Sequence, residues 1–325
     1  MTLLSAPVRV LVAGAGAFGR EHLDRLVRRP DVIVVGVADT NPAALAPLRS
    51  KLGAAERLAD PLQLIDKVEA DAIIVATPAD SHVEICTRAL GRNLAVLLEK
   101  PAAPSASAAV PLLAAERKSA GFVLPGHVLR FSQDHVRLIE IVRSGRIGEV
   151  IYVNSRRYRD DSHAVRYADT DPVLMTLIHD VDRAQWITGS DFRSVLAHRS
   201  GGAGYRSMTA FCATTATGVT CDVRTAWTFA DGDLPPDRLE VVGDRGSVEL
   251  MVGQALQVYA EGRRTDYAPP AADDPLRNEQ DHFLACVRDR SRARALDLSD
   301  ALAGLKLADA AIESLRLNGE VILSA

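Results

Sequence analysis

The strongest constraint on the fold is a glycine-rich turn near the N-terminus, in the stretch VRVLVAGAGAFG of residues 8–19. Gly14, Gly16 and Gly19 follow an apolar, β-branched run with G-x-G-x-x-G spacing. Glycine at these positions allows a tight turn, the approach of a pyrophosphate to the backbone, and close packing of the next helix on the strand. The N-terminus of that helix offers free N–H groups and a partial positive charge. The stretch therefore predicts a strand, turn and helix that bind a dinucleotide.

A carboxylate ends the second predicted strand, residues 32–38, twenty positions after Gly19. There Asp39 can accept hydrogen bonds from both ribose hydroxyls of an adenosine, whereas a 2′-phosphate would meet like charge. No arginine directly follows Asp39, although Arg49 could reach back to a phosphate. We therefore expect NAD, with NADP less favoured. Alternatively, Asp39 is only the turn residue before Asn41-Pro42, a helix-start signal.

Composition excludes several classes of protein. The 325 residues, 47% of them hydrophobic, suffice for two ordinary cores. The chain has 38 Lys and Arg against 42 Asp and Glu and no long basic run, so nucleic acid is not an expected partner. We find neither a signal-peptide pattern nor an apolar run approaching the roughly 18 residues of a membrane span, and expect a cytoplasmic protein with no membrane partner.

The four cysteines show no CxxC spacing and no clustering with histidines, so we expect free thiols and no metal site. They are Cys86, Cys212, Cys221 and Cys286. Cys212 and Cys221 could face each other across a hairpin whose turn lies near residues 216–218, as a buried reduced pair.

Short apolar runs alternate with helical patterns as far as residue 125, which predicts a doubly wound parallel α/β sheet over residues 1–125. Asn41 and Asp60 each precede a proline and are expected to cap helices. The predicted strands are residues 8–13, 32–38, 72–76, 93–98 and 122–125.

Such sheets bind ligands at the carboxyl ends of their strands. The strand of residues 93–98 delivers Glu99 and Lys100 to that edge. Lys100 can donate to substrate hydroxyls there; alternatively, it is a solvated lysine paired with Glu99. The bond before Pro101 is a candidate for the cis form.

The second half predicts a helix over residues 132–143 and then strands with short links, which favours antiparallel pairing. Two closing helices follow, one over residues 275–288 and one capped by Ser299, while residues 262–274 read as a loop. The predicted strands are residues 148–159, 192–199, 205–214, 219–229, 237–242, 247–251 and 255–259.

Four ordered motifs, GAGAFG, ATPADSH, EKP and GHVLRF, resemble those of the GFO/IDH/MocA family, named for glucose-fructose oxidoreductase and inositol dehydrogenase. The resemblance continues through residues 144–157, 241–250 and the closing helix. It implies a Rossmann domain over residues 1–125, followed over residues 126–325 by a substrate-binding and oligomerisation domain. That second domain holds a large open, mostly antiparallel sheet that often builds homodimers or homotetramers. The implied cofactor-binding residues are Gly14, Gly16, Ala17, Phe18, Gly19, Asp39, Thr40, Ala76, Thr77, Pro78, His82, Glu99 and Lys100.

The resemblance also implies a catalytic helix in DPVLMTLIHDVDRAQWITG, residues 171–189. It assigns His179 as general acid/base beside Lys100, and imidazole titrates near working pH; the alternative is a core histidine. Family members carry an aspartate four residues earlier, where this chain has Met175. Either Lys100 and His179 suffice, or Asp171 or Asp161 takes that place, or the protein is no standard dehydrogenase.

The segment RRYRDDSHAVRY, residues 156–167, is rich in groups that suit a polyhydroxylated or anionic substrate. Arg157, Tyr158 and His163 are the substrate candidates; a solvated loop or an oligomer contact is the alternative. We expect His127 and Arg130 to support the domain junction.

The leading hypothesis is an NAD-dependent dehydrogenase acting on a secondary hydroxyl of a sugar, inositol or sugar derivative. Two alternatives remain: a dinucleotide-binding sensor that acts through partners, and redox-neutral sugar chemistry assisted by bound NAD.

Overall fold

The computed structural model describes residues 6–201, 207–230, 232–290 and 294–323. The chain forms two compact units, Met1–His127 with Leu276–Leu302, and Val128–Pro275 with Ala303–Ala325. The sequence-based division between residues 125 and 126 placed the whole C-terminal half in one domain. The structure corrects this, because Leu276–Leu302 returns to the first unit.

The first unit holds a six-stranded sheet in the order β3-β2-β1-β4-β5-β6, with every neighbouring pair parallel. This confirms the predicted doubly wound sheet, whose order reverses beside β1 and β4, where such sheets bind ligands. The strand β3 was not predicted, because its three half-buried residues include only one apolar side chain. The strands are β1 Val8–Ala13, β2 Val32–Ala38, β3 Glu56–Leu58, β4 Ala72–Val75, β5 Ala95–Glu99 and β6 Val123–Gly126.

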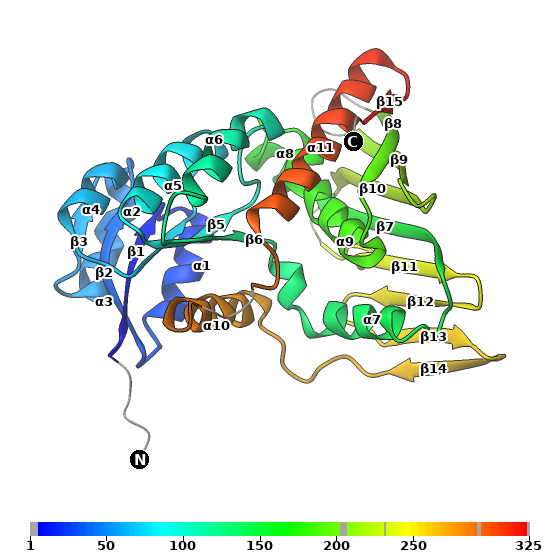
Figure 1. Ribbon diagram of the computed structural model, residues 1–325, viewed down its shortest axis with the longest axis horizontal. Helices are drawn as coiled ribbons and strands as arrows, with labels where there is room; N and C mark the ends of the chain where they lie inside the picture. Colours follow the sequence, from blue (N-terminus) through cyan, green and yellow to red (C-terminus); the bar gives the residue numbers. More distant parts are fainter. Residues whose placement is uncertain (1–5, 202–206, 231, 291–293, 324–325) are drawn as a thin grey trace. The chain divides into compact units, whose positions relative to one another are not determined.

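Helices cover both faces of this sheet, with α5 and α6 on one face and α1 and α10 on the other (Figure 1). Asn41 accepts from the N–H of Ala43 at 3.0 Å and Asp60 from that of Leu62 at 2.8 Å, as capping predicts. The helices are α1 Ala17–Leu26, α2 Pro42–Leu45, α3 Arg49–Leu52, α4 Pro61–Lys67, α5 His82–Gly91, α6 Ala106–Glu116 and α10 Pro275–Arg288.

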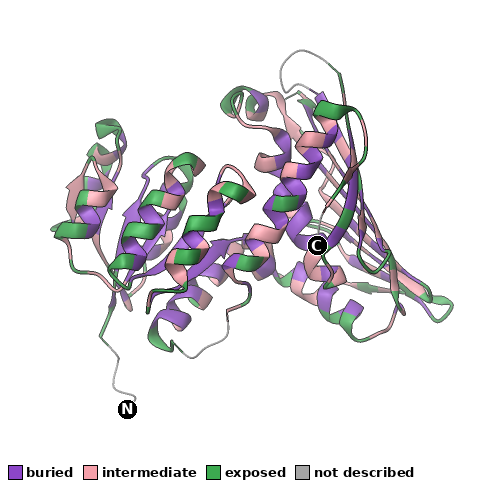
Figure 2. Ribbon diagram, turned by 45° about the horizontal axis from the view of Figure 1, so that its top comes forward, coloured by how far each residue is buried: buried purple, intermediate pink, exposed green. Residues whose placement is uncertain are grey.

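The helix α10 packs on the first unit through an apolar face. The ring of Phe283 meets that of Phe122 edge-on at 6.0 Å, and Arg288 forms an ion pair with Asp31 at 2.6 Å. Burial of this face explains why α10 packs with the first unit, although the residues directly before it in sequence belong to the second unit. Figure 2 shows the buried residues gathered in the strands and on the helix faces turned toward them.

The second unit holds a nine-stranded sheet in the order β14-β13-β12-β11-β7-β10-β9-β8-β15. Only β7 and β10 pair parallel; the other neighbours are antiparallel, as predicted. Of the predicted strand 205–214, residues 205 and 206 lie outside the described residues. The strands are β7 Val150–Asp160, β8 Phe192–Gly201, β9 Ser207–Thr215, β10 Thr220–Phe229, β11 Arg238–Gly243, β12 Gly246–Met251, β13 Leu256–Ala260, β14 Arg263–Tyr267 and β15 Val321–Ile322.

Two further predictions are corrected. The strand β14 lies inside the predicted loop 262–274, because its polar residues pair with the edge of β13. Asp297, not Ser299, caps α11: its carboxylate accepts from the N–H groups of Ser299 at 2.9 Å and Asp300 at 3.2 Å. The helices of the second unit are α7 Gln133–Arg143, α8 Asp161–Arg166 and α9 Ile178–Thr188, and α11 Leu298–Leu317 begins in the first unit and ends in the second.

One face of the large sheet carries α7 and α9, while no described helix covers the opposite face (Figures 1 and 2). All four cysteines are free thiols. In the β9–β10 ladder Cys212 pairs with Asp222 and Cys221 with Ala213, so the two thiols point to opposite faces. Cys212 is exposed, which corrects the expected buried pair. Among the helices of the described chain, none is both long and apolar enough for a membrane crossing.

Candidate active site

The glycine-rich turn connects β1 to α1, and each of its glycines meets a different environment. Gly14 has a φ of +91°, and a Cβ there would lie 2.4 Å from the carbonyl oxygen of Ala76. A Cβ at Gly19 would lie 2.0 Å from the carbonyl oxygen of Gly14. At Gly16 a Cβ would meet nothing within 4 Å. The protein thus requires glycine at the first and third positions, while the open second position beside the N-terminus of α1 fits an approaching pyrophosphate.

Asp39, directly after β2, binds the backbone of this turn and that of the start of α2. Its Oδ2 accepts from the N–H of Ala15 at 2.6 Å, and its Oδ1 accepts from the N–H of Asn41 at 2.8 Å. The two readings of Asp39 are therefore compatible. The carboxylate holds the turn, and each oxygen keeps a second lone pair that a ribose hydroxyl can use.

The residues that follow β4 lie against the glycine-rich turn. The N–H of Ala76 donates to the carbonyl of Ala13 at 2.8 Å, which continues the β1–β4 ladder. His82 is almost fully buried, with Nε2 2.8 Å from the carbonyl oxygen of Thr77 and Nδ1 2.9 Å from that of Pro101. Burial lowers the pKa of His82. This places His82 as a link between two ligand-edge segments, in keeping with a supporting role.

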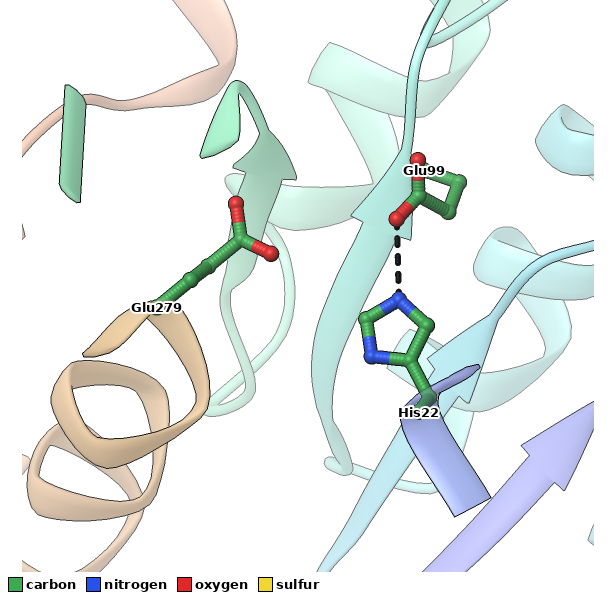
Figure 3. A group of neighbouring side chains, drawn as sticks. All are labelled: His22, Glu99 and Glu279. Atoms are coloured by element: carbon green, nitrogen blue, oxygen red, sulfur yellow. Dashed lines mark hydrogen bonds and ion pairs between the residues drawn. The ribbon is translucent and has the colours of Figure 1, made fainter. Parts of the chain in front are cut away.

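The bond between Lys100 and Pro101 is cis, as the sequence suggested. Just before it, Glu99 is 6% exposed and turned into the protein. Its Oε1 lies 2.9 Å from Nε2 of His22, and its Oε2 accepts from the backbone N–H of Lys100 at 3.2 Å (Figure 3). The Glu99 carboxylate is thus a buried support beneath Lys100.

In the second unit the predicted catalytic helix begins with a π-helical turn, Val173–Leu177, and continues as α9. His179 is half-buried, and the aspartates at 180 and 182 are buried. The carboxylate of Asp182 accepts from the Arg130 guanidinium at 2.8 to 3.1 Å. Asp182 is therefore bound to Arg130, an ion pair inside the second unit.

Sequence reasoning missed a buried ionic network around Asp180. Its Oδ1 accepts from Oγ of Ser155 at 2.5 Å, from Nε of Arg157 at 3.2 Å, and from the Arg183 guanidinium. Full burial lowers the pKa of Arg157 to about 10. The spacing of Ser155 and Arg157 predicts that they share one face of a strand. The neighbouring sequence does not predict which helix covers that face.

The residues considered as substitutes for the missing aspartate at position 175 differ in their surroundings. Asp171 accepts from one Arg199 nitrogen at 2.8 and 2.9 Å and from the N–H of Val173 at 2.9 Å. This carboxylate therefore caps the start of the π-helical turn and binds it to Arg199 on β8. Asp161 opens the short helix α8.

The three substrate candidates are not brought together. Arg157 is buried, with Nη1 3.3 Å from Asp237. Tyr158 points to the opposite face of β7, where the Arg156 guanidinium lies over its ring and Phe229 stacks on it at 4.9 Å. His163 instead lies 4.7 Å from the Trp227 ring, whose Nε1–H donates to Thr176 in the π-helical turn.

Comparisons with known proteins agree with this arrangement. Residues 8–127 match the family model described as "Oxidoreductase family, NAD-binding Rossmann fold", and residues 135–249 match the one described as "GFO/IDH/MocA C-terminal domain". "Inositol 2-dehydrogenase 2" of Saccharopolyspora erythraea is 29% identical over 93% of this chain and 91% of its own length.

Two solved structures show the same fold. Myo-inositol 2-dehydrogenase from Lactobacillus plantarum has a TM-score of 0.86 at 21% identity, covering 98% of this chain and all of its own. Scyllo-inositol dehydrogenase from Lactobacillus casei, solved with NAD(H) and scyllo-inositol, has a TM-score of 0.83 at 20% identity, covering 97% of this chain and 99% of its own.

Proposed function

The chain belongs to the GFO/IDH/MocA family of NAD-binding oxidoreductases, and from that premise we propose that it oxidises a secondary hydroxyl of a cyclic polyol or sugar with NAD. The observation that carries the proposal is the nearly full-length similarity to an inositol 2-dehydrogenase. The glycine-rich turn supports it, because Gly16 leaves open the position that a pyrophosphate needs. Asp39 favours NAD over NADP through its negative charge.

Lys100 and His179 are the residues that we propose to act at the reacting carbon. NAD supplies the hydride acceptor when it is bound. The Lys100 ammonium donates a hydrogen bond to the substrate oxygen, and the His179 imidazole takes the hydroxyl proton as the carbonyl forms. The ion pair of Asp171 with Arg199 favours the version in which Lys100 and His179 suffice over one in which Asp171 is a third acid; Asp161 stays the alternative.

Substrate contacts are proposed for the half-buried side chain of His163. Its partner Trp227 donates to Thr176, close in sequence to His179, and this supports a place on the catalytic side of the sheet. Arg157 and Tyr158 stay substrate candidates, although Arg157 is buried among carboxylates and Tyr158 lies on the opposite face of β7.

Met175 supports one alternative function, a dinucleotide-binding sensor, because a methionine cannot carry a proton. The test is NADH formation by the purified protein with inositols, aldoses, sugar acids and nucleotide sugars, each also tried with NADP. We expect turnover with NAD and one polyol class. Confirmed NAD binding without turnover on any of them would contradict the proposal. A product formed without net NADH would instead identify redox-neutral chemistry.

A further inference from the structure

Three buried side chains meet at the carboxyl end of β5, directly before Lys100 (Figure 3). They are His22 from α1, Glu99 from β5 and Glu279 from α10, and one polar atom of each lies within 4.8 Å of the others. His22 and Glu279 have no exposed surface. Two carboxyl groups are thus removed from water beside a single imidazole.

The tautomer of His22 follows from its neighbour Gln280. The side-chain nitrogen of Gln280 lies 3.2 Å from the carbonyl oxygen of His22 and 3.0 Å from its Nδ1. Because a carbonyl oxygen only accepts, the Gln280 group facing it is the NH₂, and Nδ1 must accept the second bond. The ring proton is then on Nε2, which donates to Oε1 of Glu99 at 2.9 Å.

The two glutamates differ in their hydrogen bonds. Glu99 accepts hydrogen bonds from Nε2 of His22 and from the backbone N–H of Lys100. Neither carboxyl oxygen of Glu279 has a hydrogen-bond partner within the described chain. Burial and the charge of Glu99 raise the pKa of Glu279 well above its ordinary value. Two carboxyl groups this close and this dry do not both ionise, so the proton belongs to Glu279.

We propose that Glu279 is a neutral carboxylic acid facing Glu99, and that with His22 it positions the Glu99 carboxylate that supports Lys100. The proposal rests on the role given above to Lys100. Glu279 is a positioning residue: the dipole of its neutral acid group, within 4.8 Å of Glu99, stabilises that carboxylate, whereas an ionised group would repel it. A divalent cation among the same atoms is disfavoured, because Nε2 of His22 already donates its proton to Glu99.

Stability measured against pH tests the neutral acid without any assay of activity. A carboxyl group whose folded-state pKa is raised stabilises the protein fully below its ordinary pKa, and this contribution is lost as pH rises toward the folded-state value. Glutamine has the same shape and does not titrate. We therefore expect the melting temperature of Glu279→Gln to gain on that of the wild type as pH rises above about 5. The exposed Glu84→Gln variant on α5 is the control and should show no such trend.

Turnover tests the positioning role. Glu279→Leu keeps the volume but removes the polar group that faces Glu99, so we expect kcat to fall about tenfold or more with unchanged NADH affinity and no loss of melting temperature. Glu279→Gln should restore kcat to within about twofold of the wild type, because its neutral amide dipole can face Glu99 as the neutral acid does. A purely structural role would not separate kcat from stability in this way.

Four outcomes would overturn the proposal. The first is a difference in melting temperature between Glu279→Gln and the wild type that does not change with pH. The second and third are a normal kcat in Glu279→Leu and an equal loss of kcat in Glu279→Leu and Glu279→Gln. The fourth is a stoichiometric metal ion, found by elemental analysis, that Glu279→Gln removes. If the wild type turns over no polyol, the proposed function fails and the positioning role fails with it. The stability measurement still decides whether Glu279 is neutral.

Discussion

Asp39 shows how one side chain can serve both the fold and a ligand. Its two oxygens each accept one backbone N–H, from Ala15 and Asn41, so its position is set before any ribose arrives. A carboxylate that is already ordered loses little side-chain entropy when it binds a ligand. This explains why a residue with a turn role is also suited to ribose recognition.

Replacing Asp39 by alanine is expected to weaken NAD binding by about 1–2 kcal/mol, because the ribose hydrogen bonds are lost. Isothermal titration calorimetry measures this directly. Asp60→Ala is the matched control: it also removes a carboxylate that accepts a backbone N–H, at the start of α4, and should leave the NAD affinity unchanged. An unchanged affinity in Asp39→Ala would remove Asp39 from the binding site.

His179 differs from its neighbours on α9 by being half-buried, while Asp180 and Asp182 are buried in ion pairs. We expect His179→Ala to lower turnover by about 10²-fold or more and to leave NADH affinity intact, because only proton transfer is lost. Steady-state kinetics and NADH titration measure the two effects. His198→Ala, at an exposed position on β8, is the control. Normal turnover in His179→Ala would move the acid/base role elsewhere, with Lys100 the first candidate.

In the connection between β1 and α1, we expect Gly19 to be required for folding, whereas we expect Gly16 to be required for binding of the cofactor. The Cβ of an alanine at position 19 would collide with the carbonyl oxygen of Gly14, whereas one at position 16 would meet open space. Gly16 also has a φ of −65°, which alanine adopts without strain. The two glycines therefore differ in what their substitution should change.

We expect Gly19→Ala to lower the free energy of unfolding by about 1–3 kcal/mol through overpacking. Gly16→Ala should change it by less than about 0.5 kcal/mol and weaken NAD binding about tenfold or more, because the methyl group fills the pyrophosphate position. Urea unfolding and NAD titration of both variants check the pair. Equal effects of both variants on stability would show that the turn does not divide the two roles.

The molecule as a whole consists of two units between which the chain passes more than once, since Leu276–Leu302 returns to the first. In the second unit, the face of the nine-stranded sheet opposite α9 carries no described helix. The strand register places the half-buried Tyr152 and the exposed Tyr259 on that face. Most soluble oligomers are symmetric homo-oligomers, chiefly dimers with an isologous interface. We propose that it builds a homodimer or homotetramer.

Light scattering after size-exclusion chromatography should therefore give a dimer or tetramer. Tyr259→Glu places a charge on the 40% exposed tyrosine of β13 and is expected to shift the population toward monomer. Ile33→Glu, at a 50% exposed position on β2 in the first unit, is the control and should not. A wild-type monomer at assay concentration would contradict the proposal.

Interactions between neighbouring residues determine several of the strands, helix caps and helices. The strands 8–13 and 32–38, the caps Asn41 and Asp60, and the helix 275–288 follow from side chains within a few residues of one another, so the sequence alone predicts them. The same holds for the glycine-rich turn, where conformation and close contacts are set by neighbouring residues.

Only the tertiary structure decided which distant groups meet. Gln280 bonds to His22 across 258 positions, and Glu279 faces Glu99 only because α10 returns to the first unit. The strand β7 likewise turns Arg157 toward Asp180 and Tyr158 away from it, a choice that depends on which face of the sheet α9 covers. Periodicity states which residues share a face, but burial of the whole core decides which face is inside. The charge states of the ionisable groups on a face depend on whether that face is buried.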